Sequence, residues 1–274
     1  MLSPVFIPYH WFRHVLGGVC GLALLLTPAA ARATVFNWPD LGWTAGAPAP
    51  GQTVAQSFTS VTPNDITVSV NNNGASASGA TWQSGYPAIN STKLTGGFTG
   101  VDALQLYVTS ESSLSSTIKT TVTFNAPVIN LSFQIWDVDA SSGQFADKIA
   151  QIQAIAQGGA TVGPDTVTSA VSGYNTITGS GLSTVVLGTA VASDSTNQGT
   201  ITVTFLGPIT QFSFAWSNSD SGLGAQAIGL GPLTYTVVPE LSEGWGVALL
   251  CAAAIAAHTI ARRRNALVDA IRLD

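Results

Sequence analysis

The residues of this chain best suited to chemistry are acids that follow predicted strands. Asp137 and Asp139 close the segment LSFQIWDVD, and Asp147 comes eight residues later, across the loop ASSGQFA. Asn218 and Asp220 close a similar segment, FSFAWSNSD. Ca²⁺ binds about six to eight carboxylate, amide or carbonyl oxygens. The pattern predicts a calcium site made by Asp137, Asp139 and Asp147, with Asn218 or Asp220 as further ligands.

Two other roles compete with calcium binding at these positions. Asp side chains accept hydrogen bonds from nearby backbone and so cap loops, and the chain has no dense D-x-D-x-D-G loop. A carboxylate pair about 5 to 10 Å apart would instead serve a polysaccharide-degrading enzyme. Asp137 with Asp220 is the pair that this enzymatic alternative would use.

The residue inventory of the segment 34–237 restricts its chemistry. It contains no histidine, cysteine or arginine, and its three lysines face ten acids, for a formal charge of −7. Catalysis by a Ser-His-Asp or Cys-His arrangement is therefore excluded within it, as are zinc or haem sites with imidazole or thiolate ligands. Its acidity makes nucleic acid and anionic membrane surfaces poor partners.

Short runs of alternating Thr, Val, Ile, Phe and Ser fill the segment, and clusters of Gly, Asn, Pro and Asp separate them. This pattern predicts an all-β, antiparallel β-sandwich of jelly-roll type. DKIAQIQAIA fits neither a strand nor a helix period cleanly. The runs start at Gln52, Asp65, Ala103, Thr117, Asp147, Ser183, Gly199, Ile209 and Leu233.

An internal repeat supports this fold. TVTFNAPVINLSFQIWDVD from Thr121 aligns without gaps on TVTFLGPITQFSFAWSNSD from Thr202, with Pro127 and Pro208 at matching positions. Each copy predicts a β-hairpin with its proline in the turn. The alternation in the second strands predicts two core-facing sets: Leu131, Phe133 and Ile135, and Phe212, Phe214 and Trp216.

Four aromatic residues lie in Gly- and Pro-rich loops: Trp38, Trp43, Trp82 and Tyr86. Exposed aromatics stack on the faces of sugar rings. Loop aromatics also close the ends of a sandwich core. The four residues therefore mark either a sugar-binding surface or the edges of the core.

The N-terminus has the pattern of a secretory signal peptide. Arg13 precedes the apolar run Val15–Leu26, and the sequence Ala31–Ala33 has the A-x-A form of a cleavage site. Residues 1–33 are the predicted signal peptide. The mature chain is then expected to begin at Thr34.

The C-terminus has the pattern of a membrane anchor. The motif VPELSEGWG occupies 238–246, an apolar segment follows to residue 261, and basic residues begin the tail 262–274. As a helix, Trp245–Ile260 would be about 24 Å long. The arginines indicate a cytoplasmic end, which places the segment 34–237 on the outer side. We expect a single transmembrane helix over 245–261.

This C-terminal segment resembles the IPTL-CTERM and PEP-CTERM class of sorting signals of Gram-negative bacteria. Glu240 stands where the related motif has threonine, and Gly244 is inserted before the tryptophan. The residues that carry the resemblance are Val238, Pro239, Leu241, Ser242, Glu243, Trp245 and Gly246, together with Arg262, Arg263 and Arg264.

The resemblance implies export by the Sec machinery, anchoring in the inner membrane and processing by an exosortase-type enzyme. It covers only the end of the chain. Taken with the predicted sandwich, it predicts a non-enzymatic cell-surface or extracellular-matrix protein with a structural or adhesive role. A carbohydrate-binding module is the alternative, and a polysaccharide-degrading enzyme is the third hypothesis.

Overall fold

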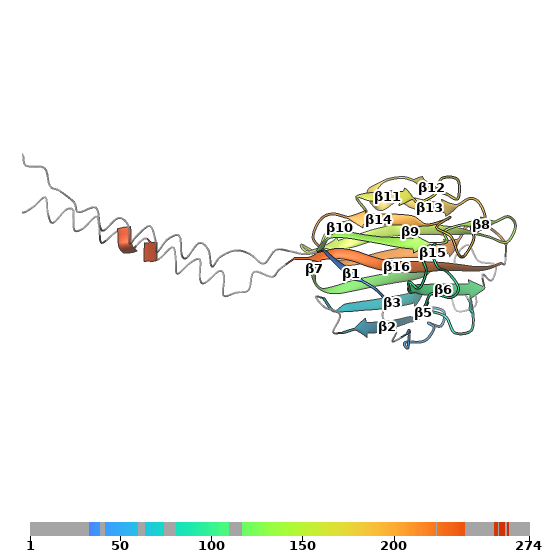
Figure 1. The fold of residues 1–274 in the computed structure, drawn as a ribbon, viewed down its shortest axis with the longest axis horizontal. Helices are drawn as coiled ribbons and strands as arrows, with labels where there is room; N and C mark the ends of the chain where they lie inside the picture. Colours follow the sequence, from blue (N-terminus) through green and yellow to red (C-terminus); the bar gives the residue numbers. More distant parts are fainter. Residues whose placement is uncertain are drawn as a thin grey trace, which may run out of the picture. The chain divides into compact units, whose positions relative to one another are not determined.

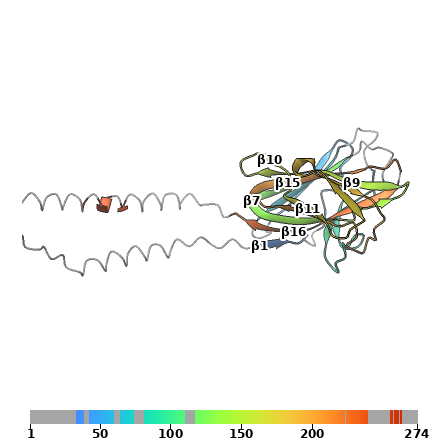
Figure 2. The same cartoon turned by 90° about the horizontal axis from the view of Figure 1, so that it is seen from above.

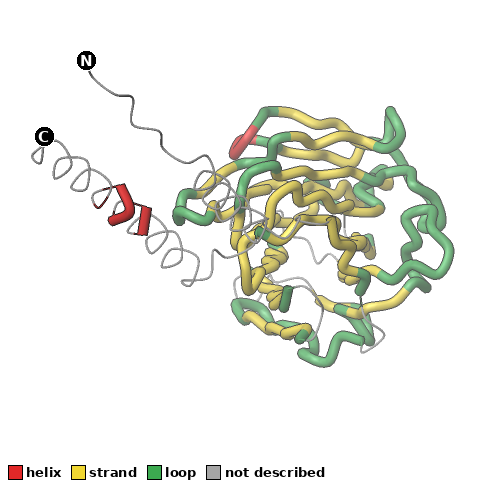
Figure 3. Tube along the Cα trace, turned by 60° about the vertical axis from the view of Figure 1, so that its left-hand side comes forward, coloured by secondary structure: helices red, strands yellow, loops and turns green. Residues whose placement is uncertain are grey.

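The computed structural model describes residues 33–38, 42–59, 64–73, 81–109, 117–222, 224–238, 255–256, 258–260 and 262. The paired strands are antiparallel throughout this part of the chain, so the predicted all-β antiparallel fold is confirmed. Figure 3 shows strands filling the domain, with loops gathered around them.

In the described part of the chain the elements of the domain are sixteen strands, most of them labelled in Figure 1, and one short 3-10 helix. They are β1 (Ala33–Phe36), β2 (Thr53–Phe58), β3 (Ile66–Asn72), β4 (Thr81–Trp82), β5 (Ala88–Asn90), β6 (Ala103–Thr109), β7 (Ile118–Trp136), β8 (Ala140–Ser141), β9 (Phe145–Ala156), β10 (Thr161–Val162), β11 (Thr166–Ser169), β12 (Asn175–Thr178), η1 (Gly181–Ser183), β13 (Val185–Gly188), β14 (Ile201–Phe205), β15 (Ile209–Asn218) and β16 (Ala225–Val237).

The long strand β7 belongs to both layers of the fold. Its first half, up to Phe124, pairs with β3 and β15, and its second half, from Val128, pairs with β14 and β16. One layer therefore runs β2-β3-β7-β15-β9-β13-β12, and the other runs β6-β16-β7-β14-β11 (Figures 1 and 2). The jelly-roll assignment stays an interpretation, because one strand is shared by both layers.

The prediction of two hairpins in the internal repeat is wrong. β7 passes through Pro127 as one strand, and β14 and β15, which flank Pro208, pair with β7 and not with each other. Each copy thus crosses from one layer to the other. β7 bends at Asn130, which has a φ of 52°. A β-bulge of this kind changes the direction of a strand without reversing it, so the chain continues into the other layer and forms no hairpin.

The predicted core faces of the repeat are confirmed. All six side chains of the two core-facing sets are at most 1% exposed. The rings of Phe133 and Phe212 stack with centroids 4.3 Å apart, and Phe124 meets Tyr235 edge-on at 5.3 Å. Phe133 lies in the half of β7 that pairs with β14, whereas Phe212 lies in β15, so these contacts join the two layers. Burial of each such side chain stabilises the fold by about 1.5 to 3 kcal/mol.

A bulge in β9 explains why DKIAQIQAIA matched no single period. Gln151 has a φ of 50°, and the pairing with β15 shifts register there. Ile149 points into the core before the bulge, and Ile152 and Ala154 do so after it. The alternation therefore changes phase within the strand, which a test for one fixed period cannot detect.

Both ends of the domain lie at one end of the sandwich. Ala33 of β1 pairs with Thr236 of β16, and the backbone N–H of Val238 donates to the carbonyl of Pro127. Trp136, at the far end of β7, pairs with Gly229. The strand from Val128 to Trp136 spans about 25 Å, so the loop after Trp136 lies away from the two chain exits (Figure 1).

The terminal predictions fall mostly outside the described residues. These include the signal peptide up to Arg32, the motif residues after Val238 and most of the segment 245–261. Within the part of the chain that the structure describes, no helix has the length and apolar character needed to cross a bilayer.

Candidate functional site

Three of the predicted site residues lie together at the end of β7 and the start of β9. Asp137, Asp139 and Asp147 are 9%, 4% and 0% exposed. Burial of a carboxylate is costly unless hydrogen bonds or opposite charges stabilise it. The contacts of each acid therefore decide what this group, called here the acid cluster, can do.

Asp147 uses both carboxyl oxygens inside the protein. The indole Nε1 of Trp216 donates to its Oδ1 at 2.7 Å, and the backbone N–H of Asp139 donates to its Oδ2 at 3.2 Å. Burial raises the pKa of Asp147 well above its usual range, although the Trp216 hydrogen bond opposes the shift. This acid holds the loop 137–147 onto the core.

Asp139 ties the first loop to a second one. Its Oδ2 accepts a hydrogen bond from the backbone N–H of Ala192 at 2.7 Å. Burial raises the pKa of Asp139 to about 6, the Ala192 hydrogen bond opposes this, and the charge of Asp194 adds to it. The loop 189–200 is thus fixed to the end of β7.

Asp137 has a different environment. It directly follows β7 with a φ of 64°, and its Oδ1 is buried without a hydrogen-bond partner in the described part of the chain. Burial raises the pKa of Asp137 to about 8; the charges of Asp139 and Asp194 add to the shift and Lys93 opposes it. This carboxyl group is therefore mostly protonated at neutral pH.

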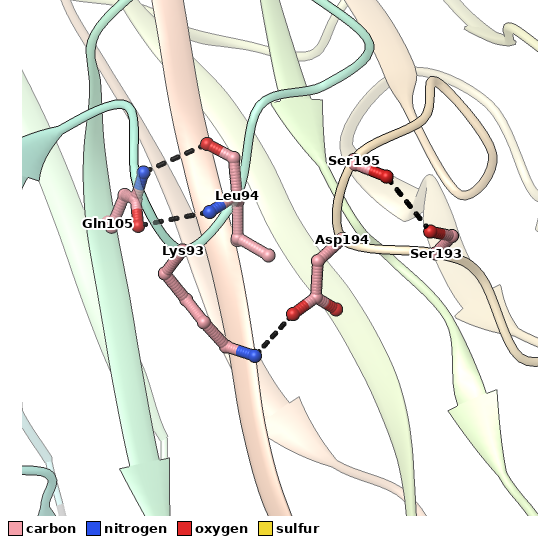
Figure 4. Close-up of polar contacts among 6 residues, drawn as sticks. All are labelled: Lys93, Leu94, Gln105, Ser193, Asp194 and Ser195. Atoms are coloured by element: carbon pink, nitrogen blue, oxygen red, sulfur yellow. Dashed lines mark hydrogen bonds and ion pairs between the residues drawn. The ribbon is translucent and has the colours of Figure 1, made fainter.

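Lys93 and Asp194 form an ion pair (Figure 4), and their charges act on both Asp137 and Asp139. Burial lowers the pKa of Lys93, but the hydrogen bond and charge of Asp194 outweigh it and raise the pKa. The backbone N–H of Thr95 also donates to the Asp194 carbonyl at 2.9 Å. Beside the pair, Gln105 bonds both backbone groups of Leu94. The loop 91–100 is held in this way against 189–200.

Several oxygens of the predicted calcium ligands accept hydrogen bonds within the protein, and calcium binding stays a prediction. The Oδ1 of Asn218 accepts from the backbone N–H groups of Ala146 and Asp220, both at 2.9 Å, and Asp220 Oδ1 accepts from Gly222 at 3.1 Å. Across the described ranges, no three acidic, histidine or cysteine side chains are placed to hold a metal ion. Backbone N–H groups donate to Asn218, Asp220, Asp139 and Asp147, which is the bonding that the loop-capping alternative expects.

The four loop aromatics differ in burial: Trp38 is buried, and the other three are half-buried. Trp38 is 3% exposed, donates to the Gly231 carbonyl at 2.9 Å and meets Phe36 and Phe58 edge-on. A sugar contact is therefore wrong for Trp38, which packs in the core.

The other three aromatics are half-buried. The indole N–H of Trp43 donates to Gly46 at 2.7 Å and that of Trp82 to Pro48 at 3.0 Å, while Tyr86 meets Tyr107 edge-on. Each of them is held by a neighbouring segment. Their role in sugar binding stays a prediction.

Sequence analysis missed a second core on the outer face of β7 and β16. Trp136 is fully buried there, under a loop that includes Leu94 and Gly96. A Cβ on Gly96 would overlap the Trp136 ring, and one on Gly231 would come within 2.9 Å of it. The glycines of AIGLGPL are therefore needed for packing. Because glycine is uncommon in strands, the sequence of the first half of β16 does not predict a strand.

A groove of about 300 Å³ lies beside this second core. We call it the Phe98 groove, because the Phe98 side chain is 43% exposed at its border and rests on Trp136 with ring centroids 5.8 Å apart. None of its lining side chains is charged. They belong to Val35, Asn37, Phe98, Val101, Ser132, Phe133, Gln134, Thr202, Pro232 and Thr234.

Replacing Lys93 by glutamine is expected to destabilise the protein only slightly. The side chains of Lys93 and Asp194 are 32% and 48% exposed, and such exposed pairs contribute about 0.2 to 1 kcal/mol. Thermal unfolding should show a loss of about 1 to 3 °C, smaller in high salt. Lys119→Gln is the control, and an equal loss in both variants would contradict a role for the ion pair.

Comparisons with known proteins identify no family. No family model matches the chain, and no curated protein matches it in sequence. Among solved structures, the N-terminal domain of the Streptococcus gordonii adhesin Sgo0707 aligns over 77% of this chain at 9% identity with a TM-score of 0.36. The aligned part spans 49% of that chain.

Two carbohydrate-binding modules are also similar. TmCBM27, described as recognising mannan, aligns over 62% of this chain and 89% of its own, at 12% identity and a TM-score of 0.34. The family 11 module of the Clostridium thermocellum cellulase Lic26A-Cel5E aligns over 78% and 100%, at 10% identity and a TM-score of 0.29. Likeness this weak assigns neither a fold family nor a ligand to the chain.

Proposed function

We propose that this protein is an exported, non-enzymatic component of the bacterial cell surface or extracellular matrix, with a structural or adhesive role. The observation that carries the proposal is that two acids of the acid cluster hold loops through hydrogen bonds. Asp147 and Asp139 direct their carboxyl oxygens at Trp216 Nε1 and at backbone N–H groups. Asp139 and Asp147 therefore hold loops in place, which is a structural role.

The placement of the chain ends supports display at a surface. β1 and the end of β16 lie side by side, and the acid cluster lies about 25 Å away along β7. A domain tethered through residues after Val238 would present the loops 91–100 and 189–200 away from the tether. Surface and matrix proteins need such a free end in order to meet their partners.

The partners follow from the terminal segments. Residues 1–33 direct the chain to the Sec machinery, and 238–246 with Arg262, Arg263 and Arg264 direct it to an exosortase-type enzyme of a Gram-negative bacterium. The apolar segment 245–261 anchors the chain in the inner membrane until processing. The mature product then carries the sandwich 34–237.

Mass spectrometry of the surface-exposed protein tests this proposal. We expect a mature form that begins at Thr34 and ends within or close to 238–246. Replacing Arg262, Arg263 and Arg264 by glutamine should leave unprocessed chain in the membrane fraction, whereas Lys119→Gln should be processed normally. A surface form that still carries residues 247–274 would refute sorting.

A further inference from the structure

We propose that the Phe98 groove binds a neutral polysaccharide chain, with Phe98 as the stacking residue. The inference rests on the proposed function, because a protein displayed outside the cell meets such polymers. The groove spans the outer face of β1, β16, β7 and β14, and its volume of about 300 Å³ is at the lower end of ligand sites. It is separate from the acid cluster and from the four aromatics that the sequence suggested.

The polar lining suits a ligand that carries hydroxyl groups. Ser132, Thr202 and Thr234 reach the groove from three adjacent strands, β7, β14 and β16. Within the described ranges, no protein hydrogen bond is made by any of these three side-chain hydroxyls. A hydroxyl both donates and accepts, so the three match the hydroxyls of a sugar, which also do both.

Phe98 is held in position before any ligand arrives. Its backbone N–H donates to the Thr95 carbonyl at 2.9 Å, and the N–H of Thr95 donates to Asp194. Its ring lies tilted at 33° against buried Trp136. A rigid, partly exposed aromatic ring offers an apolar face to the C–H face of a sugar at little entropic cost.

The lining also separates a neutral glycan from other ligands. No charged side chain lines the groove, and the formal charge of −7 over 34–237 repels anionic polymers. An extended peptide binds most simply by adding a strand to a free sheet edge. The groove lies on a sheet face, where the ladder bonds of β7 are already made to β14 and β16.

Affinity measurements on the full chain in detergent test the inference. The panel contains neutral dextran, galactomannan and xyloglucan, anionic alginate, and an unstructured neutral peptide. We expect binding to at least one neutral glycan, weakened about tenfold or more by Phe98→Ala. Thr202→Val removes only a hydroxyl at similar volume and should weaken binding about threefold to tenfold.

The control is Leu182→Ala, which removes a side chain that is 54% exposed in η1, outside the groove. Its affinity should equal that of the wild type, and near-ultraviolet circular dichroism checks the fold of each variant. The inference is overturned if the folded chain binds no neutral glycan, prefers alginate or the peptide, or binds equally well with Phe98→Ala and Thr202→Val.

Localisation keeps this inference distinct from the proposed function. Phe98→Ala should reach the cell surface as the wild type does. If Phe98→Ala loses glycan binding but is displayed normally, the proposed function stands and the result supports the groove as the glycan-binding site. Wild-type chain that binds glycan but stays inside the cell refutes the proposed function alone.

Discussion

Replacing Asp137 by asparagine is expected to raise the melting temperature at pH 8.5 by about 5 to 10 °C, with little change at pH 4. The Asp137 carboxyl is buried beside Asp139 and Asp194, and its Oδ1 has no partner within the described residues. Above pH 8 it must carry an unpaired charge there, which destabilises the folded state. Asparagine is neutral at every pH and tolerates the φ of 64°.

The direction of the change in stability with pH follows from the raised pKa of Asp137. The folded protein releases the Asp137 proton at about pH 8, whereas the unfolded chain releases it at about pH 4. The stability that this group contributes is fully present below pH 4. It is lost as the pH rises to 8, because the folded state then binds more protons than the unfolded one. A four-unit difference in pKa represents about 5 kcal/mol, and half of this, about 2.5 kcal/mol, corresponds to about 5 to 10 °C.

Thermal unfolding of wild type and Asp137→Asn between pH 4 and pH 9 measures this effect. Asp102→Asn makes the same chemical change outside the acid cluster and is the matched control, which should not reproduce the gain at pH 8.5. The melting temperature should depend less steeply on pH in Asp137→Asn than in the wild type. Some dependence should remain, because the pKa values of Asp139 and Asp147 are raised as well. A variant less stable than wild type at pH 8.5 would contradict the expectation.

Replacing Gly188 by alanine is expected to lower the melting temperature by about 10 °C. Gly188 ends β13 against the backbone of Asp139, and a Cβ at this position would overlap the Asp139 carbonyl. That carbonyl accepts the backbone N–H of Asp147, so it cannot move without disturbing the acid cluster. Overpacking of this kind costs about 1 to 3 kcal/mol and occasionally more.

Gly158→Ala is the matched control, since nothing lies within 4 Å of a Cβ there. Both variants add one methyl group and remove the same backbone freedom from the unfolded chain. Differential scanning calorimetry should show the large loss for Gly188→Ala alone. Melting temperatures within about 2 °C of each other would show that the close approach to Asp139 is not rigid.

Part of the acid cluster could be predicted from the sequence. Asp137 and Asp139 follow a strand with a clear alternation and Asp147 begins the next run, so the sequence predicts that the three lie together, as the structure shows. The partners of these acids could not be predicted. Trp216 lies 69 residues from Asp147, and Asp194 comes from a loop without any strand pattern. Asn218 pairs with Asp147 between β15 and β9 and accepts from Ala146 and Asp220, whereas Asp220 accepts from Gly222 in its own turn.

The sequence by itself determined the all-β class, the inward faces of β7 and β15, and the absence of imidazole, thiolate and guanidinium chemistry between 34 and 237. Alternation and composition are local properties, so they can be read without coordinates. Only the tertiary structure decided that the repeat crosses between layers, that Trp136 is buried on an outer face, and that Phe98 borders a groove. Alternation specifies which side of a strand is apolar but not which strand or loop lies against it, and that choice depends on contacts between residues far apart in the chain.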